Sequence, residues 1–124
     1  MKQTIHSNNA PAAIGPYAQA QMIGGFIFTS GQLGIDVEKG ALADGVEAQA
    51  HAAMKNLGQI LSAAGAGYAD IVKTTIFVKD LGDFATVNKV YASYFEGDYP
   101  ARSCVQVAAL PMGGLVEIEA IAKI

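Results

Sequence analysis

Residues 99–119 read YPARSCVQVAALPMGGLVEIE and form two strand-like runs on either side of a connector that contains Pro and Gly. Successive side chains of a strand point to opposite faces of the sheet. In the first run the mostly apolar face carries Ser103, Val105, Val107 and Ala109. In the second run the apolar face carries Val116, Ile118, Ala120 and Ala122. If both apolar faces lie on one core, the other side of the sheet presents a cation, a thiol and two carboxylates, from Arg102, Cys104, Glu117 and Glu119.

The segments upstream alternate between strand and helix patterns. Strands are predicted over residues 2–6, 17–23, 26–31 and 71–79, and Gly24-Gly25 predicts a tight hairpin between the second and the third. Helices are predicted over residues 46–64 and 84–95, where apolar residues recur at helical spacing. Asp44 with Glu47 resembles a capping box for the first helix, and Asp83 can cap the second. Residues 7–16 and 34–45 are predicted to be loops.

This order of elements predicts an α+β fold in a single domain over residues 1–124, with two helices packed on one face of a mixed sheet. Two helices can cover only one face. The other face must therefore meet water or another subunit. The side chains predicted on or beside that uncovered face are Tyr17, Gln19, Phe28, Arg102, Cys104 and Glu117.

The composition also favours a subunit interface. Apolar residues make up 52% of the chain and charged residues only 15%, where about 25% is usual. We interpret the excess as a buried interface, with a large core as the alternative. The net charge of −3 argues against a nucleic-acid partner, which normally needs a basic patch. A single cysteine, the lack of an apolar leader and the lack of a run of roughly 18 apolar residues predict a cytoplasmic protein without a membrane span.

Several motifs carry a resemblance to a known family. The segment PARSC at 100–104, followed by VEIEA at 116–120, resembles the signature of the RidA/YjgF family of small imine/enamine deaminases. APAAIGPYAQ at 10–19 and TSGQ at 29–32 resemble the N-terminal blocks of that family, and VKTTIFVKD at 72–80 resembles its central strand. The resemblance covers nearly the whole chain. It implies a chorismate-mutase-like fold assembled as a homotrimer, with sheets facing inward and active sites in clefts between subunits.

The resemblance also implies an activity, the hydrolysis of 2-imino acids or their 2-enamino tautomers, such as 2-iminobutanoate and 2-iminopropanoate, to 2-oxo acids and ammonia. In that role Arg102 binds the substrate carboxylate, Glu117 activates water, and Tyr17 helps to orient the substrate. The implied substrate-binding residues are Gly31, Ser30, Asn88 and Cys104. No cofactor is expected, because an imine is already electrophilic. The two histidines and the cysteine show no metal-ligand spacing.

Each of these residues also has an ordinary structural interpretation. Arg102 can be a surface ion-pairing residue, and Glu117 a solvated strand residue or an interface ion pair. Tyr17 can be a packed aromatic, and Asn88 an exposed helix residue. Gly31 can mark a bend at the end of a strand. Cys104 beside Arg102 could be a nucleophile with a low pKa, but no base lies near it in sequence, which favours a role in the pocket wall.

Two other functions remain open from the sequence. One is a ribonuclease or translation inhibitor, as some members of the family are described. The acidic balance and the absence of a histidine pair count against it. The other is a ligand-binding trimer without turnover. An assay of ammonia release from freshly generated 2-iminobutanoate separates the deaminase from both.

Overall fold

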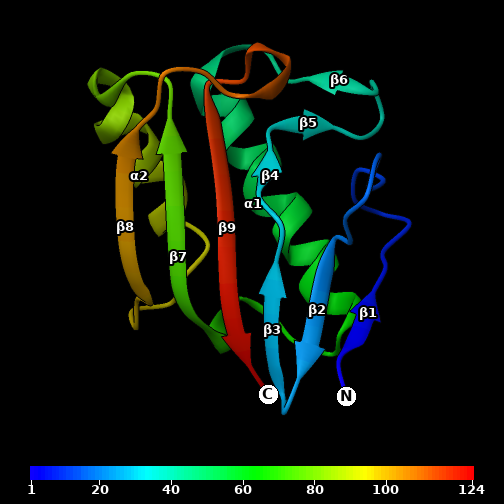
Figure 1. Cartoon of the computed structure of the whole chain (residues 1–124). Helices are drawn as coiled ribbons and strands as arrows, with labels where there is room; N and C mark the ends of the chain where they lie inside the picture. Colours follow the sequence, from blue (N-terminus) through cyan, green and yellow to red (C-terminus); the bar gives the residue numbers. More distant parts are fainter.

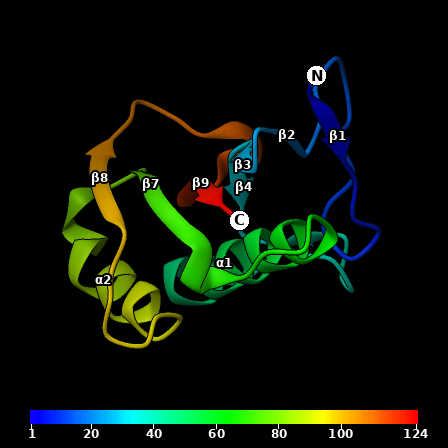
Figure 2. The same cartoon turned by 90° about the horizontal axis from the view of Figure 1, so that it is seen from below.

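The computed structural model describes residues Met1 to Ile124 and shows a sheet with both helices on the same face (Figures 1 and 2). The strands are β1 (Gln3–Ile5), β2 (Ala20–Ile23), β3 (Phe26–Thr29), β4 (Gln32–Leu33), β5 (Ile35–Asp36), β6 (Ala41–Leu42), β7 (Ile71–Val78), β8 (Ala101–Gln106) and β9 (Val116–Lys123). The helices are α1 (Gly45–Ala63) and α2 (Phe84–Ala92), with short 3-10 turns η1 (Tyr68–Asp70), η2 (Leu81–Asp83) and η3 (Pro111–Gly113). The predicted α+β class is confirmed.

The main sheet runs in the order β1-β2-β3-β9-β7-β8, and the short β4 also pairs with β9. β7 and β8 are parallel, whereas the other neighbouring strands are antiparallel, so the sheet is mixed as predicted. β9 lies between β3 and β7, in the middle of the sheet (Figure 1). The second run of the C-terminal motif is therefore the central strand, and the first run, β8, is an edge strand.

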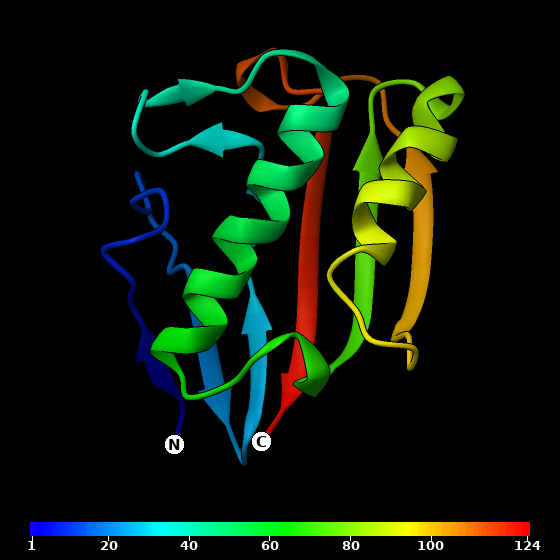
Figure 3. The ribbon, with the colours of Figure 1, turned by 180° about the vertical axis from the view of Figure 1, so that it is seen from behind.

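Helix α1 supplies most of the helical half of the core. Its buried apolar residues are Ala50, Ala53, Met54, Leu57, Ile60 and Leu61. They recur every three or four positions, which places them on one side of the helix, and Figure 3 shows α1 lying along the back of the sheet. The prediction of this helix is confirmed to within one residue. The predicted capping box is wrong, because the Asp44 side chain makes no cap hydrogen bond and lies 3.7 Å from Lys39 Nζ.

The tight hairpin between β2 and β3 is confirmed. Gly24 and Gly25 both have positive φ, 57° and 80°, which is the conformation that a two-residue hairpin of this kind requires and that glycine adopts without a steric cost. The strand that enters the hairpin is shorter than predicted and begins at Ala20. Gln19 is instead buried, and its Nε2 donates hydrogen bonds to the carbonyls of Ser7 and Pro11, so residues 17–19 hold the N-terminal loop.

Two other boundaries differ from the prediction. The segment predicted as a loop over 34–45 contains the short hairpin β5–β6, which pairs Ile35 with Leu42 and Asp36 with Ala41. Helix α2 ends at Ala92 rather than at residue 95, and the Asp83 side chain makes no cap hydrogen bond.

None of the helices is both long and apolar enough to cross a membrane.

The largest correction concerns the faces of β8. Residues directly opposite each other on neighbouring strands point to the same face. Arg102 pairs with Thr74, which is buried beneath the helices, and Cys104 pairs with Ile76 of the core. Arg102 and Cys104 therefore face the helices, contrary to the prediction, and Ser103 and Val105 face the open side.

The open side of the sheet is itself rich in apolar side chains. Glu117 lies on it, in register with Phe77 and Val105, and Phe28 pairs with Ile121 on the same face. Phe28 and Val105 keep 45% and 44% of their surface exposed in the single chain. The prediction that Phe28 and Glu117 lie on the uncovered face is confirmed.

Candidate active site

One pocket gathers Tyr17, Ser30, Gly31 and Glu117, four of the residues predicted for the site. It has a volume of about 560 Å³ and lies between the N-terminal loop, β4, β9 and the turn η3. Its other lining residues are mostly apolar and include Pro11, Ile14, Leu33 and Met112. We refer to it below as the Glu117 pocket.

The backbone of Gly31 is in contact with the Glu117 side chain. A Cβ placed on Gly31 would lie 2.8 Å from the Glu117 carboxyl carbon, closer than any real side chain allows. A side chain on residue 31 would therefore displace the Glu117 side chain, so the glycine leaves room for that carboxyl group in its present position. The preceding Ser30 is fixed by its hydroxyl, which donates to the carbonyl of Ala18 at 2.6 Å. Ser30 thus connects the end of β3 to the segment before β2 through this hydrogen bond.

Tyr17 stands at the exposed rim of this pocket. Its hydroxyl accepts a weak hydrogen bond from the amide of Ile14 at 3.4 Å, and about half of the residue, 53%, remains exposed. The backbone below it is held by the buried Gln19, as described above. The phenol is therefore placed over the pocket and keeps the capacity to donate a hydrogen bond.

The environment of Glu117 raises the pKa of its carboxyl group. Partial burial is the main cause, because it disfavours the charged form, and the negative charge of Glu119 two residues along β9 adds to it. No cation of the same chain forms an ion pair with Glu117, since the side-chain ion pair found in the structure is Lys39–Asp44. A carboxyl group with a raised pKa and no partner suits proton transfer better than structural pairing.

Arg102 lies in a second hollow, of about 480 Å³, on the helix side of β8. Asn88, Tyr91, Ala92, Tyr99 and Pro100 line it together with Arg102. The guanidinium Nη1 donates a hydrogen bond to the side-chain oxygen of Asn88. The structure therefore brings Arg102 and Asn88 together, as expected for the site, and it gives the guanidinium no carboxylate partner.

Cys104 is partly buried and packs against the core next to Arg102. Burial raises the pKa of its thiol, and the nearby Arg102 charge only partly offsets this. A thiol with a raised pKa is a poor nucleophile at neutral pH. Cys104 lines neither of the two hollows within one chain.

The two hollows lie on opposite faces of the sheet. Arg102 pairs with Thr74 and Glu117 pairs with Phe77, and residues three apart on β7 point in opposite directions. The structure thus brings Tyr17, Ser30, Gly31 and Glu117 together in one place and Arg102 with Asn88 in another. It does not join the two groups within one chain.

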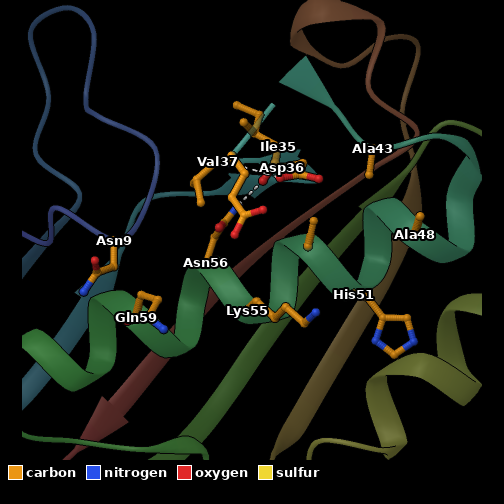
Figure 4. Close-up of a pocket in the computed structure, with 12 residues that line it drawn as sticks. Asn9, Ile35, Asp36, Val37, Ala43, Ala48, His51, Lys55, Asn56 and Gln59 are labelled. Carbon is orange, nitrogen blue, oxygen red and sulfur yellow. Dashed lines mark hydrogen bonds between the residues drawn. The ribbon is translucent and has the colours of Figure 1, made fainter. Parts of the chain in front are cut away.

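A third hollow, larger than these two, contains none of the predicted site residues. It has a volume of about 650 Å³ and lies between the outer side of α1 and the β5–β6 hairpin (Figure 4). His51, Lys55 and Asn56 are among its lining residues, but Asn56 donates to the carbonyls of Leu33 and Ile35, and the His51 ring is turned toward α2, where its Nδ1 lies 2.9 Å from the Tyr94 hydroxyl. No three His, Cys, Asp or Glu side chains lie close enough together to hold a metal ion.

The residues around Arg102 include two that were not predicted from the sequence. The guanidinium carbon lies 5.3 Å from the ring centre of Phe84 and 5.2 Å from that of Tyr91. Phe84, Asn88 and Tyr91 are spaced four and three residues apart, so they form one stripe of α2. That spacing was visible in the sequence, but without the fold nothing indicated that Arg102 lies against it.

The fold and these two hollows define a small α+β protein with a carboxyl group in a pocket on one face and an arginine without a carboxylate partner on the other. The family described as Endoribonuclease L-PSP matches residues 7–124. The 2-iminobutanoate/2-iminopropanoate deaminase of Salmonella typhimurium is 53% identical over 98% of both chains. The mouse protein of the same name is 51% identical and matches 98% of this chain and 91% of its own.

Solved structures agree with these matches. RidA from the Antarctic bacterium Psychrobacter sp. superposes with a TM-score of 0.95 at 48% identity, covering 98% of this chain and 99% of that one. TdcF of E. coli, solved with bound serine, also has a TM-score of 0.95, at 45% identity and 98% coverage of each chain. This chain belongs to the RidA/YjgF family, the family of the Endoribonuclease L-PSP description.

Proposed function

We propose that this protein hydrolyses 2-imino acids, and their 2-enamino tautomers, to 2-oxo acids and ammonia. The observation that carries the proposal is the state of Arg102, a partly buried guanidinium with no carboxylate partner, which borders an open hollow. A buried charge without a counter-ion is costly unless a ligand completes it. The curated relatives at about half identity are named for this reaction with 2-iminobutanoate and 2-iminopropanoate.

The chemistry follows from the two hollows. Arg102 binds the substrate carboxylate through its planar fork, with Asn88 accepting a hydrogen bond from Nη1. Glu117 takes a proton from water as the water oxygen attacks the imine carbon. The resulting carbinolamine then loses ammonia after its nitrogen is protonated, which leaves the 2-oxo acid. Imine and water are thus converted to 2-oxo acid and ammonia without an oxidant or a reductant. Tyr17 donates a hydrogen bond that orients the substrate.

This mechanism requires two copies of the chain at each site, because Arg102 and Glu117 of one chain lie on opposite faces. Because the family resemblance implies a homotrimer, we propose a homotrimer in which Arg102 of one subunit meets the Glu117 pocket of its neighbour. The exposed apolar residues of the open sheet face, among them Phe28 and Val105, support such an assembly. We propose that Cys104 belongs to the wall of the shared cleft in this arrangement, although it lines neither hollow of the single chain.

Mixing two inactive variants tests the shared site. Arg102→Ala and Glu117→Gln each leave one half intact, so equimolar co-refolding into one oligomer should restore about a quarter of the wild-type rate of ammonia release from 2-iminobutanoate. As a control, we expect an equimolar mixture of wild type and the double variant to release ammonia at half of the full rate before co-refolding. After co-refolding into mixed oligomers, the rate should be about a quarter of the full rate. A mixture that stays inactive would place both residues in one chain, and a wild type without turnover would refute the deaminase itself.

We also propose that nucleic acid is not a partner, despite the family description. Net charge is −3, and Arg102 is the single arginine of the chain. Binding to a phosphate backbone normally uses a cluster of Lys and Arg. The serine bound to TdcF is instead a small amino acid with a carboxylate, which resembles the proposed substrate. The cytoplasmic location stays a prediction.

A further inference from the structure

Arg102 lies close to two aromatic rings from one stripe of α2. Its guanidinium carbon lies 5.3 Å from the centre of the Phe84 ring and 5.2 Å from that of Tyr91. These distances are within the range of cation–π attraction, about 6 Å. Asn88, between the two rings on the same stripe, accepts the hydrogen bond from Nη1.

Tyr91 is fixed more firmly than the other ring. Its hydroxyl lies 2.7 Å from the hydroxyl of Thr74, and both residues are buried, with 4% and 1% of their surface exposed. The ring also packs against Phe95, with ring centres 4.9 Å apart. Phe84, in contrast, lies at the surface. Tyr91 therefore has one orientation, and its face is directed at the guanidinium.

Thr74 is also the register partner of Arg102 on the neighbouring strand. Its hydroxyl is a polar group in a buried stretch of β7, and Tyr91 is the partner that satisfies it. The Thr74–Tyr91 hydrogen bond thus links β7, the strand that pairs with the strand of Arg102, to helix α2. A polar pair in this place is unexplained by core packing alone, since Val and Phe would fill the same space.

We infer that Tyr91, anchored by Thr74, is a positioning residue that holds the Arg102 guanidinium in the direction needed to bind a substrate carboxylate. The inference rests on the proposed role of Arg102 and goes beyond it, because neither Tyr91 nor Thr74 contacts the reacting atoms. Preorganising the guanidinium reduces the entropy lost when the carboxylate binds. Loss of the ring should therefore weaken substrate binding and leave the chemical step intact.

The central comparison is between Tyr91→Leu and Tyr68→Leu in the intact oligomer. Both remove a ring from the same aromatic cluster, but Tyr68 contacts Tyr94 and Phe95 and does not touch Arg102. Both should lower the melting temperature. Tyr91→Leu alone should raise KM for 2-iminobutanoate, and the Kd for 2-oxobutanoate, by roughly 5- to 30-fold with kcat little changed.

The anchor is tested by Tyr91→Phe and Thr74→Val, which remove the same hydrogen bond from its two ends. Each should raise KM by a smaller factor, roughly 2- to 5-fold. The KM of the double variant should be no higher than that of the single variant with the higher KM. These two changes keep the volume of the core, so they remain informative if Tyr91→Leu fails to fold. Additive losses in the double variant would show that the hydrogen bond is not the shared cause.

A spectroscopic measurement is independent of turnover. Because the chain has a single arginine, labelling with ¹⁵N-arginine gives one Nε–Hε signal, and the flanking rings should shift it upfield of free arginine. Tyr91→Leu should move it back, and Tyr68→Leu should not. A folded Tyr91→Leu variant with wild-type KM and the Nε–Hε signal still at its wild-type position would overturn the inference. A wild type with the shifted signal and no deaminase activity would instead refute the proposed function and leave the clamp standing.

Discussion

The carboxyl group of Glu117 lies directly against the backbone of Gly31, so that a Cβ on residue 31 would stand 2.8 Å from the Glu117 carboxyl carbon. Glu117 is on the central strand β9, and Gly31 lies just before β4, which pairs with β9. The absence of a side chain on residue 31 therefore leaves free the space that the candidate base occupies.

This contact predicts that Gly31→Ala moves the carboxyl group of Glu117 out of place. A displacement of about 1 Å can cost roughly 10²-fold in rate, so we expect a fall in kcat of about 10- to 100-fold. Gly67→Ala is the matched control, because a Cβ there meets nothing within 4 Å and the backbone does not have positive φ. Steady-state ammonia release from both variants is the measurement. Equal activities would show that Glu117 has room to adjust.

Glu117→Gln should lower kcat by about 10²–10⁴-fold, because the amide keeps the shape and loses the basicity. The melting temperature at pH 7 should not fall. Burial raises the pKa of Glu117 in the folded chain, so its contribution to stability is present at low pH and lost as the pH rises through that pKa. If Glu117 were instead a structural ion pair, the variant would melt earlier and keep full kcat.

The acid side of the kcat profile should respond to Glu119. The negative charge of Glu119 helps to raise the pKa of Glu117, so Glu119→Gln should lower that pKa and preserve activity to lower pH. The comparison is a pH series of kcat for wild type and Glu119→Gln, corrected for spontaneous imine hydrolysis. An acid limb that does not move would mean that a group other than Glu117 controls it.

Cys104→Ser should retain kcat within a few-fold, since the thiol has a raised pKa and no base beside it. Cys104 is the only cysteine, so alkylation can be followed as one mass increment, and we expect it to be slow at pH 7. A fall of several orders of magnitude in the serine variant, with the oligomer intact, would revive a nucleophilic role.

The sequence allowed most elements to be predicted, because hydrophobic periodicity and glycine pairs are local signals. Helix α1 and the Gly24-Gly25 hairpin follow from them directly. The face of β8 that packs against the helices could not be predicted in this way. Alternation separates the two faces of a strand but identifies the inner one only if the other is polar. Here the open face is apolar too, with Phe28 and Val105 exposed on it, so the alternation alone wrongly predicts that Val105 faces the core.

The same limit explains what could be known of the site. The residues of the Glu117 pocket were predicted by resemblance, and the fold then placed them together. The setting of Arg102 depends on Tyr91 of α2 and Thr74 of β7, and contacts between a helix and two strands are set by tertiary packing. No spacing along the chain records that the ring of Tyr91 meets a guanidinium eleven residues later.

Met112 is the one residue other than glycine with positive φ, at 61°, and it lies in η3 at the rim of the Glu117 pocket with 62% of its surface exposed. A left-handed backbone costs a residue with a side chain about 1–2 kcal/mol, part of which glycine gives back through its greater freedom when unfolded. Met112→Gly should therefore stabilise the protein by roughly 0.5–1 kcal/mol. Met112→Ala keeps the strain and removes the exposed side chain, so its stability should stay near wild type. Urea unfolding of the three proteins decides between strain and side-chain contacts as the origin of any change. If the glycine variant were no more stable than the alanine variant, the left-handed turn would carry no measurable strain.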